Sequence, residues 1–221
     1  MTLSLENSIT KTASTVVVVF TLMGVYFCLS PYLVPTDLNA KITLFLYGEE
    51  YTKNAIPAIS NLSFTEFMHR VLGAIYLVIG LLQFNISFRN KFIGLHRLLG
   101  KIFILLTLTA GASAIILVLF VPFSGPLESI PVFLFATIML YSIYRAYKHI
   151  RKKEIMQHKA WMLKTYAIGL GIVPLRIIAF ILLNTTTIED QNVLILSMYL
   201  GWGLSFAVAM WYGNLFYKSV K

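Results

Sequence analysis

Three histidines in this sequence are each followed directly by a cationic residue, and each pair stands at the start of a long apolar run. The pairs are His69-Arg70, His96-Arg97 and His158-Lys159. A neighbouring cation disfavours protonation of an imidazole, and so does the partial positive charge of a helix N-terminus. A neutral imidazole beside cationic donors suits metal or haem ligation, with the cations facing carboxylates or phosphates. The structural alternative is an interfacial histidine beside a snorkelling cation.

Two of the apolar runs carry a polar stripe at helical spacing. On the second run the stripe is His69, Gly73, Tyr76, Gly80 and Gln83. On the fifth run the stripe is His158, Met162, Thr165, Gly169 and Arg176. If these antiparallel stripes face each other, they form two polar clusters. The outer cluster is His69, Tyr76 and Arg176, with Glu66 nearby, and the inner cluster is Gln83, His96, Arg97, His158 and Lys159.

Arg176 is the most informative single residue, because it lies within a predicted membrane span. A charged side chain at that depth costs at least about 2.5 kcal/mol on insertion scales, so its default interpretation is functional. No Asp or Glu lies in any predicted span, and Glu66 is spaced to pair with Arg70 on its own helix. We therefore expect Arg176 to hold backbone carbonyls, water or the anionic group of a ligand, with snorkelling as the alternative.

The elements that position these residues are predicted to be transmembrane helices. The 221 residues are 58% hydrophobic and 12% charged, whereas an ordinary soluble chain has about 25% charged residues. The single cysteine, Cys28, excludes an intrachain disulfide framework. Runs long enough to cross a bilayer predict an all-α, polytopic bundle of six helices in a single integral membrane domain, 1–221, with an outer loop at 35–66. The predicted spans are 15–34, 67–88, 98–121, 127–147, 160–183 and 193–217.

The charges predict the orientation of this bundle. Most of the 18 Lys and Arg residues fall on the same side of the six spans as both termini, while most of the nine acids fall on the other side. The positive-inside rule then places the N- and C-termini in the cytoplasm. The net charge of +9 is thus a topology signal, which predicts the lipid bilayer as a partner and no nucleic acid.

The combined pattern resembles a mostly bacterial family of multi-pass membrane proteins that is known only as a domain of unknown function. The resemblance covers about 66–176 and rests on His69-Arg70, Gln83, Arg89, His96-Arg97-x-x-Gly100, His158-x-x-Trp161-Met162, Tyr166 and Arg176. It implies an inner or plasma membrane location in a bacterium and no settled activity. A looser likeness is to two-haem b-type cytochromes, which hold haem with histidines near both ends of facing helices. Here Gln83 and Arg176 replace two such ligands, so at most one bis-histidine site, His96 with His158, remains for haem iron.

Three classes of function fit these residues. The first is a membrane redox protein that binds haem b through His96 and His158, or a quinone. The second is a transporter of an anion or small solute through Arg176, because Gly169, Gly171 and Pro174 before it can break the fifth helix, and broken helices build substrate sites. The third is a non-catalytic accessory protein in which the clusters only hold the bundle together.

Overall fold

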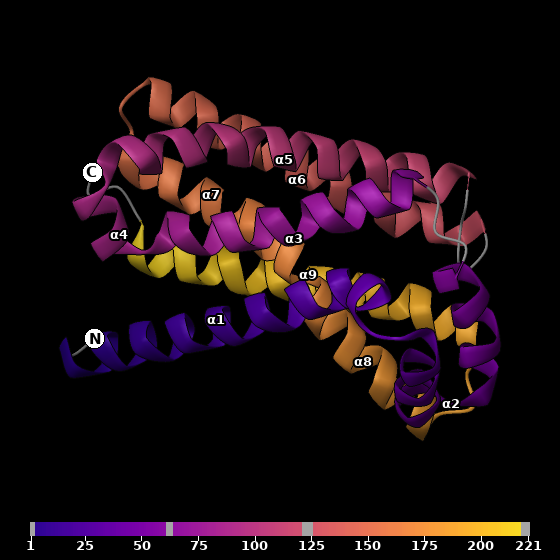
Figure 1. The fold of residues 1–221 in the computed structure, drawn as a ribbon. Coiled ribbons are helices and arrows are strands. Elements are labelled where there is room, and N and C mark those ends of the chain that lie inside the picture. The colour runs from indigo at the N-terminus through magenta and orange to yellow at the C-terminus, as the bar shows by residue number, and fades with distance from the viewer. Residues whose placement is uncertain (1–2, 61–63, 121–125, 218–221) are drawn as a thin grey trace.

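The computed structural model describes residues 3–60, 64–120 and 126–217, and within these ranges it contains helices and no strand. Figure 1 shows the helices as an elongated bundle. The elements are α1 (Leu3–Leu33), α2 (Thr36–Ser60), α3 (Phe64–Phe84), α4 (Ile86–Lys91), α5 (Ile93–Phe120), the short 3-10 helix η1 (Pro126–Glu128), α6 (Ser129–Arg151), α7 (Ile155–Leu170), α8 (Ile172–Thr185) and α9 (Asp190–Phe216).

Six helical segments of the described chain are long and apolar enough to cross a membrane, which confirms the all-α, six-span prediction. They are Ile9–Leu33, Phe64–Phe84, Ile93–Phe120, Pro126–Arg151, Ile155–Thr185 and Asp190–Phe216. All six begin before the predicted start, because the helix continues beyond the apolar run. The fifth span consists of two helices, α7 and α8.

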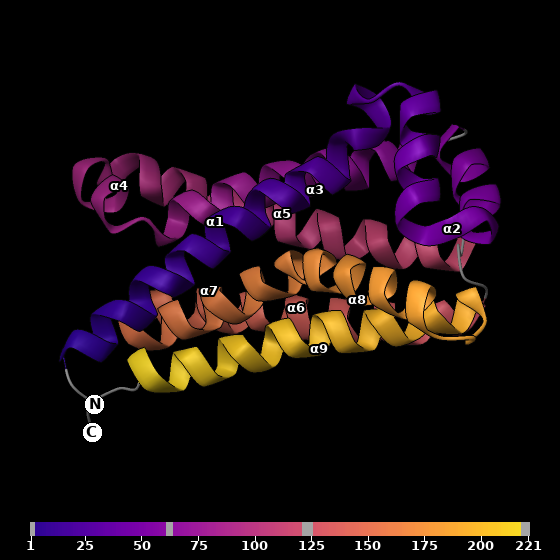
Figure 2. The same cartoon turned by 90° about the horizontal axis from the view of Figure 1, so that it is seen from below.

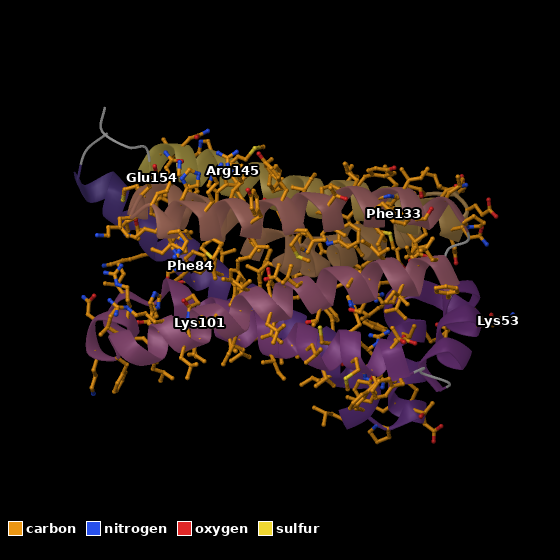
Figure 3. All side chains as sticks on the ribbon, turned by 90° about the horizontal axis from the view of Figure 1, so that it is seen from above. Lys53, Phe84, Lys101, Phe133, Arg145 and Glu154 are labelled. Atoms are coloured by element: carbon orange, nitrogen blue, oxygen red, sulfur yellow. The ribbon has the colours of Figure 1, made fainter. Side chains whose placement is uncertain are left out.

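The two ends of the bundle differ in their charges. Helix α1 begins and α9 ends at the same end, beside α4 (Figures 1 and 2). Lys101, Arg145 and Glu154 lie at that end in Figure 3, and Lys53 lies at the other. We call the first the basic end and the second, which carries α2, the α2 end. An even number of membrane crossings requires the start of α1 and the end of α9 to lie at the same end of the bundle. The placement of the basic end in the cytoplasm stays a prediction.

The connection between the first two spans, 35–66, contains a helix that the sequence did not predict, and its position on the outer side stays a prediction. Helix α2 covers 36–60 and lies across the α2 end in both views (Figures 1 and 2). It bends at Gly48, whose φ of 83° falls in the left-handed region that favours glycine. The amide of Asn39 donates to the Ser30 carbonyl at 3.0 Å, and the amide of Asn184 donates to the Leu46 carbonyl at 2.8 Å. These bonds tie α2 to α1 and α8.

Helices α3 and α7 are held together by two reciprocal tyrosine hydrogen bonds in the middle of the bundle. The Tyr76 hydroxyl donates to the Thr165 carbonyl at 2.7 Å, and the Tyr166 hydroxyl donates to the Leu77 carbonyl at 2.9 Å. The Tyr166 hydroxyl also lies 2.7 Å from that of Thr21, which joins α1 to the pair. The polar stripes predicted on the second and fifth spans therefore do face each other at this level.

A glycine on the opposite helix makes room for each of these rings. A Cβ at Gly80 would lie 2.2 Å from the Tyr166 ring, and a Cβ at Gly169 would lie 2.2 Å from the Tyr76 ring. Tyr76 also stacks on Phe103 at a centroid distance of 4.7 Å. We call Tyr76, Gly80, Tyr166 and Gly169 the tyrosine clasp. It fixes how closely the second and fifth spans approach.

The fifth span breaks at Gly171, as the Gly and Pro residues of this segment predict. Pro174 has no backbone N–H and cannot bond the carbonyl of Leu170, four residues earlier. The C-cap of helix α7 is Gly171, whose N–H donates to the carbonyls of Ala167 and Ile168 at 3.0 and 3.1 Å. Beyond this point α8 leaves the line of α7 and turns toward α2 (Figure 1).

The turn between α6 and α7 carries a titratable pair at the basic end. The imidazole of His149 hydrogen-bonds the carboxylate of exposed Glu154. This hydrogen bond is the main cause that holds the pKa of Glu154 below its ordinary value of 4.5, and Lys152 and Lys148 lower it further. Because the pKa is lower in the folded chain, the pair stabilises the fold above the unfolded pKa and stops doing so as the pH falls through the folded pKa.

We expect Glu154→Gln to lower the thermal unfolding midpoint slightly at pH 7 and to have a smaller effect near pH 3, because protonation of wild-type Glu154 as the pH falls removes the contribution of the pair. The measurement is a pair of melting curves for each protein in the same detergent. Glu49→Gln, which removes another exposed carboxylate, this one paired with Lys53 at 3.0 Å, is the matched control. A Glu154→Gln effect of the same size at both pH values would show that the pair does not titrate as described.

Candidate functional site

A cavity of about 640 Å³ lies among the helices toward the α2 end. Its volume falls within the range of about 300–1,000 Å³ that is usual for small-molecule sites. The three residues of the outer cluster all line it: His69 and Tyr76 from α3, and Arg176 from α8. The structure thus brings the predicted outer cluster together around one space.

One part of the cavity wall is charged. Arg70 and Glu66 both line it and are joined by an ion pair at 2.9 Å, as their spacing on one helix predicts. Arg176, Glu128 and Asp190 line the same space, so it contains two guanidinium groups and three carboxylates. Most of the remaining wall is apolar, and includes Phe135, Met139, Ile168, Leu194 and Trp202.

The hydrogen bonds of His69 determine which of its ring nitrogens carries the proton. The hydroxyl of Ser113 donates to the Ala110 carbonyl at 3.1 Å. Its oxygen is 2.9 Å from Nδ1 of His69 and therefore accepts a hydrogen bond from that atom. With Nδ1 as the donor, the neutral ring keeps its lone pair on Nε2. His69 can then accept a proton or a hydrogen bond from a ligand through Nε2.

The break in the fifth span is part of the cavity wall. Ile168 and Gly169 line the cavity before Gly171, and Ile172 and Arg176 line it after the break. An α-helix places residues of one face three or four positions apart, and Ile172 and Arg176 follow that spacing on α8. The direction of α8 therefore decides where the Arg176 guanidinium lies relative to His69.

The inner cluster lies at the basic end and comes together only in part. The Gln83 amide donates to the backbone carbonyl of His96 at 3.3 Å, and His96 lies within electrostatic range of His158. The two cations of the cluster point elsewhere: Arg97 is exposed, and the ammonium of Lys159 lies 5.9 Å from the Tyr217 ring centroid. Gln83 and His96 are in contact, but the residues of this cluster do not line the cavity.

The two histidines of the inner cluster differ in their hydrogen bonds. Nδ1 of His158 donates to the Ala146 carbonyl at 3.0 Å, which leaves Nε2 with the lone pair. A backbone carbonyl that accepts from the other ring nitrogen is a usual partner of a metal-binding histidine. Nδ1 of His96 is buried and has no hydrogen-bond partner. Within the described ranges, no group of three or more His, Cys, Asp or Glu residues gathers to hold a free metal ion.

The sequence did not single out several of the cavity residues. Glu128, Asp190, Gln191 and Trp202 all line it, and Glu128 is buried. In the sequence, Glu128 and Asp190 indicate only the topology, because they lie at or beyond the ends of the predicted spans. One feature of the sequence could have indicated that these acids lie close together. Glu66, Glu128 and Asp190 all stand at the starts of spans that begin on the same side, so a bundle brings them to one end.

Comparisons with known proteins agree with this description of the chain. Comparison with curated proteins and with solved structures found no match. The family described as "Predicted membrane protein (DUF2306)", whose function is unknown, matches residues 66–212, from the first turn of α3 almost to the end of α9. This match covers well over half of the chain and includes the tyrosine clasp and both polar clusters. The chain is a multi-pass membrane protein that belongs to this family.

Proposed function

We propose that this protein binds a quinone in the cavity at the α2 end and acts as a membrane redox protein. The observation that supports this proposal is the composition of the cavity wall. It combines Arg176 and His69 with a mainly apolar lining of about the size that a small ligand needs. A quinone likewise combines polar and apolar parts, because its two carbonyl oxygens are polar and its ring and tail are apolar.

Each part of the cavity has a role in this binding mode. The guanidinium of Arg176 donates hydrogen bonds to a quinone carbonyl, and Nε2 of His69 accepts one from the quinol hydroxyl. The rings of Phe135 and Trp202, whose centroids are 5.5 Å apart, provide an aromatic wall for the quinone ring. The apolar residues Met139 and Leu194 contact the tail.

Reduction of a quinone to a quinol takes two electrons and two protons. His69, Glu66 and Glu128 line the cavity and can carry the protons. The electrons come from a redox partner. Haem b, when bound, carries single electrons, and His96 and His158 in the inner cluster are the residues that would hold it; an absorption spectrum of the purified protein tests that part of the proposal separately.

Quenching of Trp202 fluorescence by a short-chain quinone tests the binding. Trp202 lines the cavity, whereas Trp161 and Trp211 do not. We expect a short-chain ubiquinone to quench the wild-type protein at micromolar concentrations and Arg176→Gln to weaken binding by about tenfold or more, which is the loss of one hydrogen bond from a charged donor. Trp202→Phe removes most of the saturable signal.

Two further variants separate binding from folding. Lys101→Gln removes an exposed cation at the basic end and should leave the titration unchanged. Arg176→Lys keeps the charge and loses the planar fork of donors, so we expect an intermediate affinity. If Arg176→Gln and wild type quench equally, or if saturable quenching persists in Trp202→Phe, the quinone proposal is wrong. Loss of folded protein in Arg176→Gln without a binding defect in Arg176→Lys would favour the accessory-protein alternative.

Transport of a small anion is the second candidate, and the break at Gly171 is the observation that favours it. Broken helices often form the substrate sites of secondary transporters, and here the break lies in the wall of a cavity that contains two arginines. Uptake of a labelled organic anion into proteoliposomes, lost in Arg176→Gln and unaffected by the quinone, would decide for transport over redox function.

A further inference from the structure

Two cations at the basic end approach the same aromatic ring. The Arg145 guanidinium on α6 lies 4.8 Å from the ring centroid of Trp161, and the Lys164 ammonium on α7 lies 3.9 Å from it. Both side chains are half-buried, as is Trp161. The positive charges of α6 and α7 are therefore neighbours, which is unfavourable unless an anion lies close to both.

No carboxylate in the part of the chain that the structure describes pairs with either cation. Arg145 donates to the Tyr141 hydroxyl at 2.7 Å, and its second terminal nitrogen lies 3.4 Å from Nε2 of His149. Glu154 is bonded to the other nitrogen of His149 and so is one residue removed from Arg145. Among the described residues, neither Arg145 nor Lys164 forms an ion pair with an acid.

The depth of the two cations matches that of lipid headgroups. Arg145 lies six residues before the end of α6, and Lys164 lies nine residues after the start of α7, which places them about 9 and 14 Å along their helices from the basic end. The two spans contain 26 and 31 residues, whereas about 20 cross the hydrocarbon core. With these extra turns at the basic end, the helices extend through the headgroup region and the cations lie near its boundary with the acyl chains.

The surface beside the cations suits an acyl chain. Leu134 and Tyr141 precede Arg145 on the same stripe of α6, at helical spacing. Both are exposed, with relative accessibilities of 46% and 49%. A molecule whose anionic group contacts Arg145 and Lys164 can thus lay an apolar chain along α6. A free phosphate would use the cations and leave this surface uncovered.

We propose that Arg145 and Lys164 form a binding site for the phosphate group of an anionic phospholipid. The guanidinium and the ammonium donate to the phosphate oxygens, and the acyl chains pack along the exposed face of α6. Basic sites between transmembrane helices on one side of the membrane bind anionic headgroups in this manner. Trp161 holds the two cations in place by contact with both. This site lies at the end of the bundle opposite the cavity and does not depend on what the cavity binds.

Native mass spectrometry of the whole protein, with phosphatidylglycerol and phosphatidylcholine of identical acyl chains, tests this proposal. We expect wild type to retain phosphatidylglycerol about tenfold better than phosphatidylcholine. The double variant Arg145→Gln, Lys164→Gln should lose this preference. The matched control is Lys101→Gln, Lys148→Gln, which removes two exposed cations from the same end and should keep it.

Two more arms make the outcome decisive. The double variant Arg145→Lys, Lys164→Arg preserves both charges and should keep most of the preference, which separates a binding defect from a folding defect. Inorganic phosphate at millimolar concentration should not displace the lipid, because it lacks the acyl contacts. If the control double variant loses the preference as fully as Arg145→Gln, Lys164→Gln does, the effect is general surface charge and the site does not exist. Displacement by inorganic phosphate would equally overturn the assignment to a lipid.

Discussion

Gly201→Ala should unfold at a clearly lower temperature than the wild-type protein. A Cβ on Gly201 of α9 would lie 2.5 Å from both the Cα and the backbone nitrogen of Leu175 on α8. Real Cβ atoms essentially never approach so closely, and a backbone atom cannot rotate aside as a side chain can. Helices α8 and α9 must therefore separate, and overpacking of this kind costs typically 1–3 kcal/mol. Close backbone approach at small residues is a principal source of stability between transmembrane helices.

The measurement is thermal unfolding in detergent, followed by circular dichroism. Gly94→Ala is the control, because a Cβ there meets nothing within 4 Å of it in the described chain. Alanine is the better helix former by roughly 0.5–1 kcal/mol, so Gly94→Ala should be neutral or slightly stabilising. Leu175 precedes Arg176, so Gly201→Ala should also weaken ligand binding in the cavity. Equal melting temperatures for the two variants would mean that α8 and α9 are farther apart than described.

Tyr166→Ala should have the second large effect on stability. Its side chain is almost completely buried, at 1% exposure, and it fills the space above Gly80 in the tyrosine clasp. The ring also lies 5.5 Å from that of Phe84. Truncation of a buried aromatic side chain to alanine costs about 3–5 kcal/mol. We expect a value near 3 kcal/mol here, because lipid tails are as apolar as the helix interface and part of the transfer gain is absent.

Tyr166→Phe separates the ring from its hydroxyl. Phenylalanine keeps the packing against Gly80 and loses the hydrogen bonds to Leu77 and Thr21. Hydrogen bonds between membrane helices average about 0.6 kcal/mol, so this variant should lose about 1 kcal/mol. Equilibrium unfolding of both variants in mixed micelles gives the two free energies. Similar losses in Tyr166→Ala and Tyr166→Phe would show that ring packing contributes little and that the clasp is a hydrogen-bond device alone.

The features that the sequence predicted correctly depend on local rules. Helical spacing placed Tyr76 and Gly80 on one stripe, and apolar length predicted that this stripe would lie in a membrane span. The missing N–H of Pro174 predicted the break at Gly171. The four-residue spacing of Glu66 and Arg70 predicted their ion pair. Each of these follows from neighbours along one helix.

The features that the sequence did not reveal depend on how helices cross. Nothing in the pattern indicates that Gly80 receives Tyr166 from another helix, or that Gly201 meets the backbone of Leu175, because neither lies in a glycine motif within one span. The same holds for Glu128 and Asp190, whose place in the cavity wall follows only from the packed bundle. The inner cluster shows where adjacency in sequence misleads. Arg97 and Lys159 each follow a histidine, but successive residues of a helix point in different directions, so these cations point away from the cluster.

The hydrogen bond between Asn184 and the Leu46 carbonyl joins α8 to α2. Helix α8 begins after the break at Gly171 and is bonded to α2 near its other end. We expect a change in the direction of α8 at Gly171 to move both Arg176 and α2. The occupancy of the cavity and the position of α2 should therefore change together, and a spectroscopic label on α2 can follow this change.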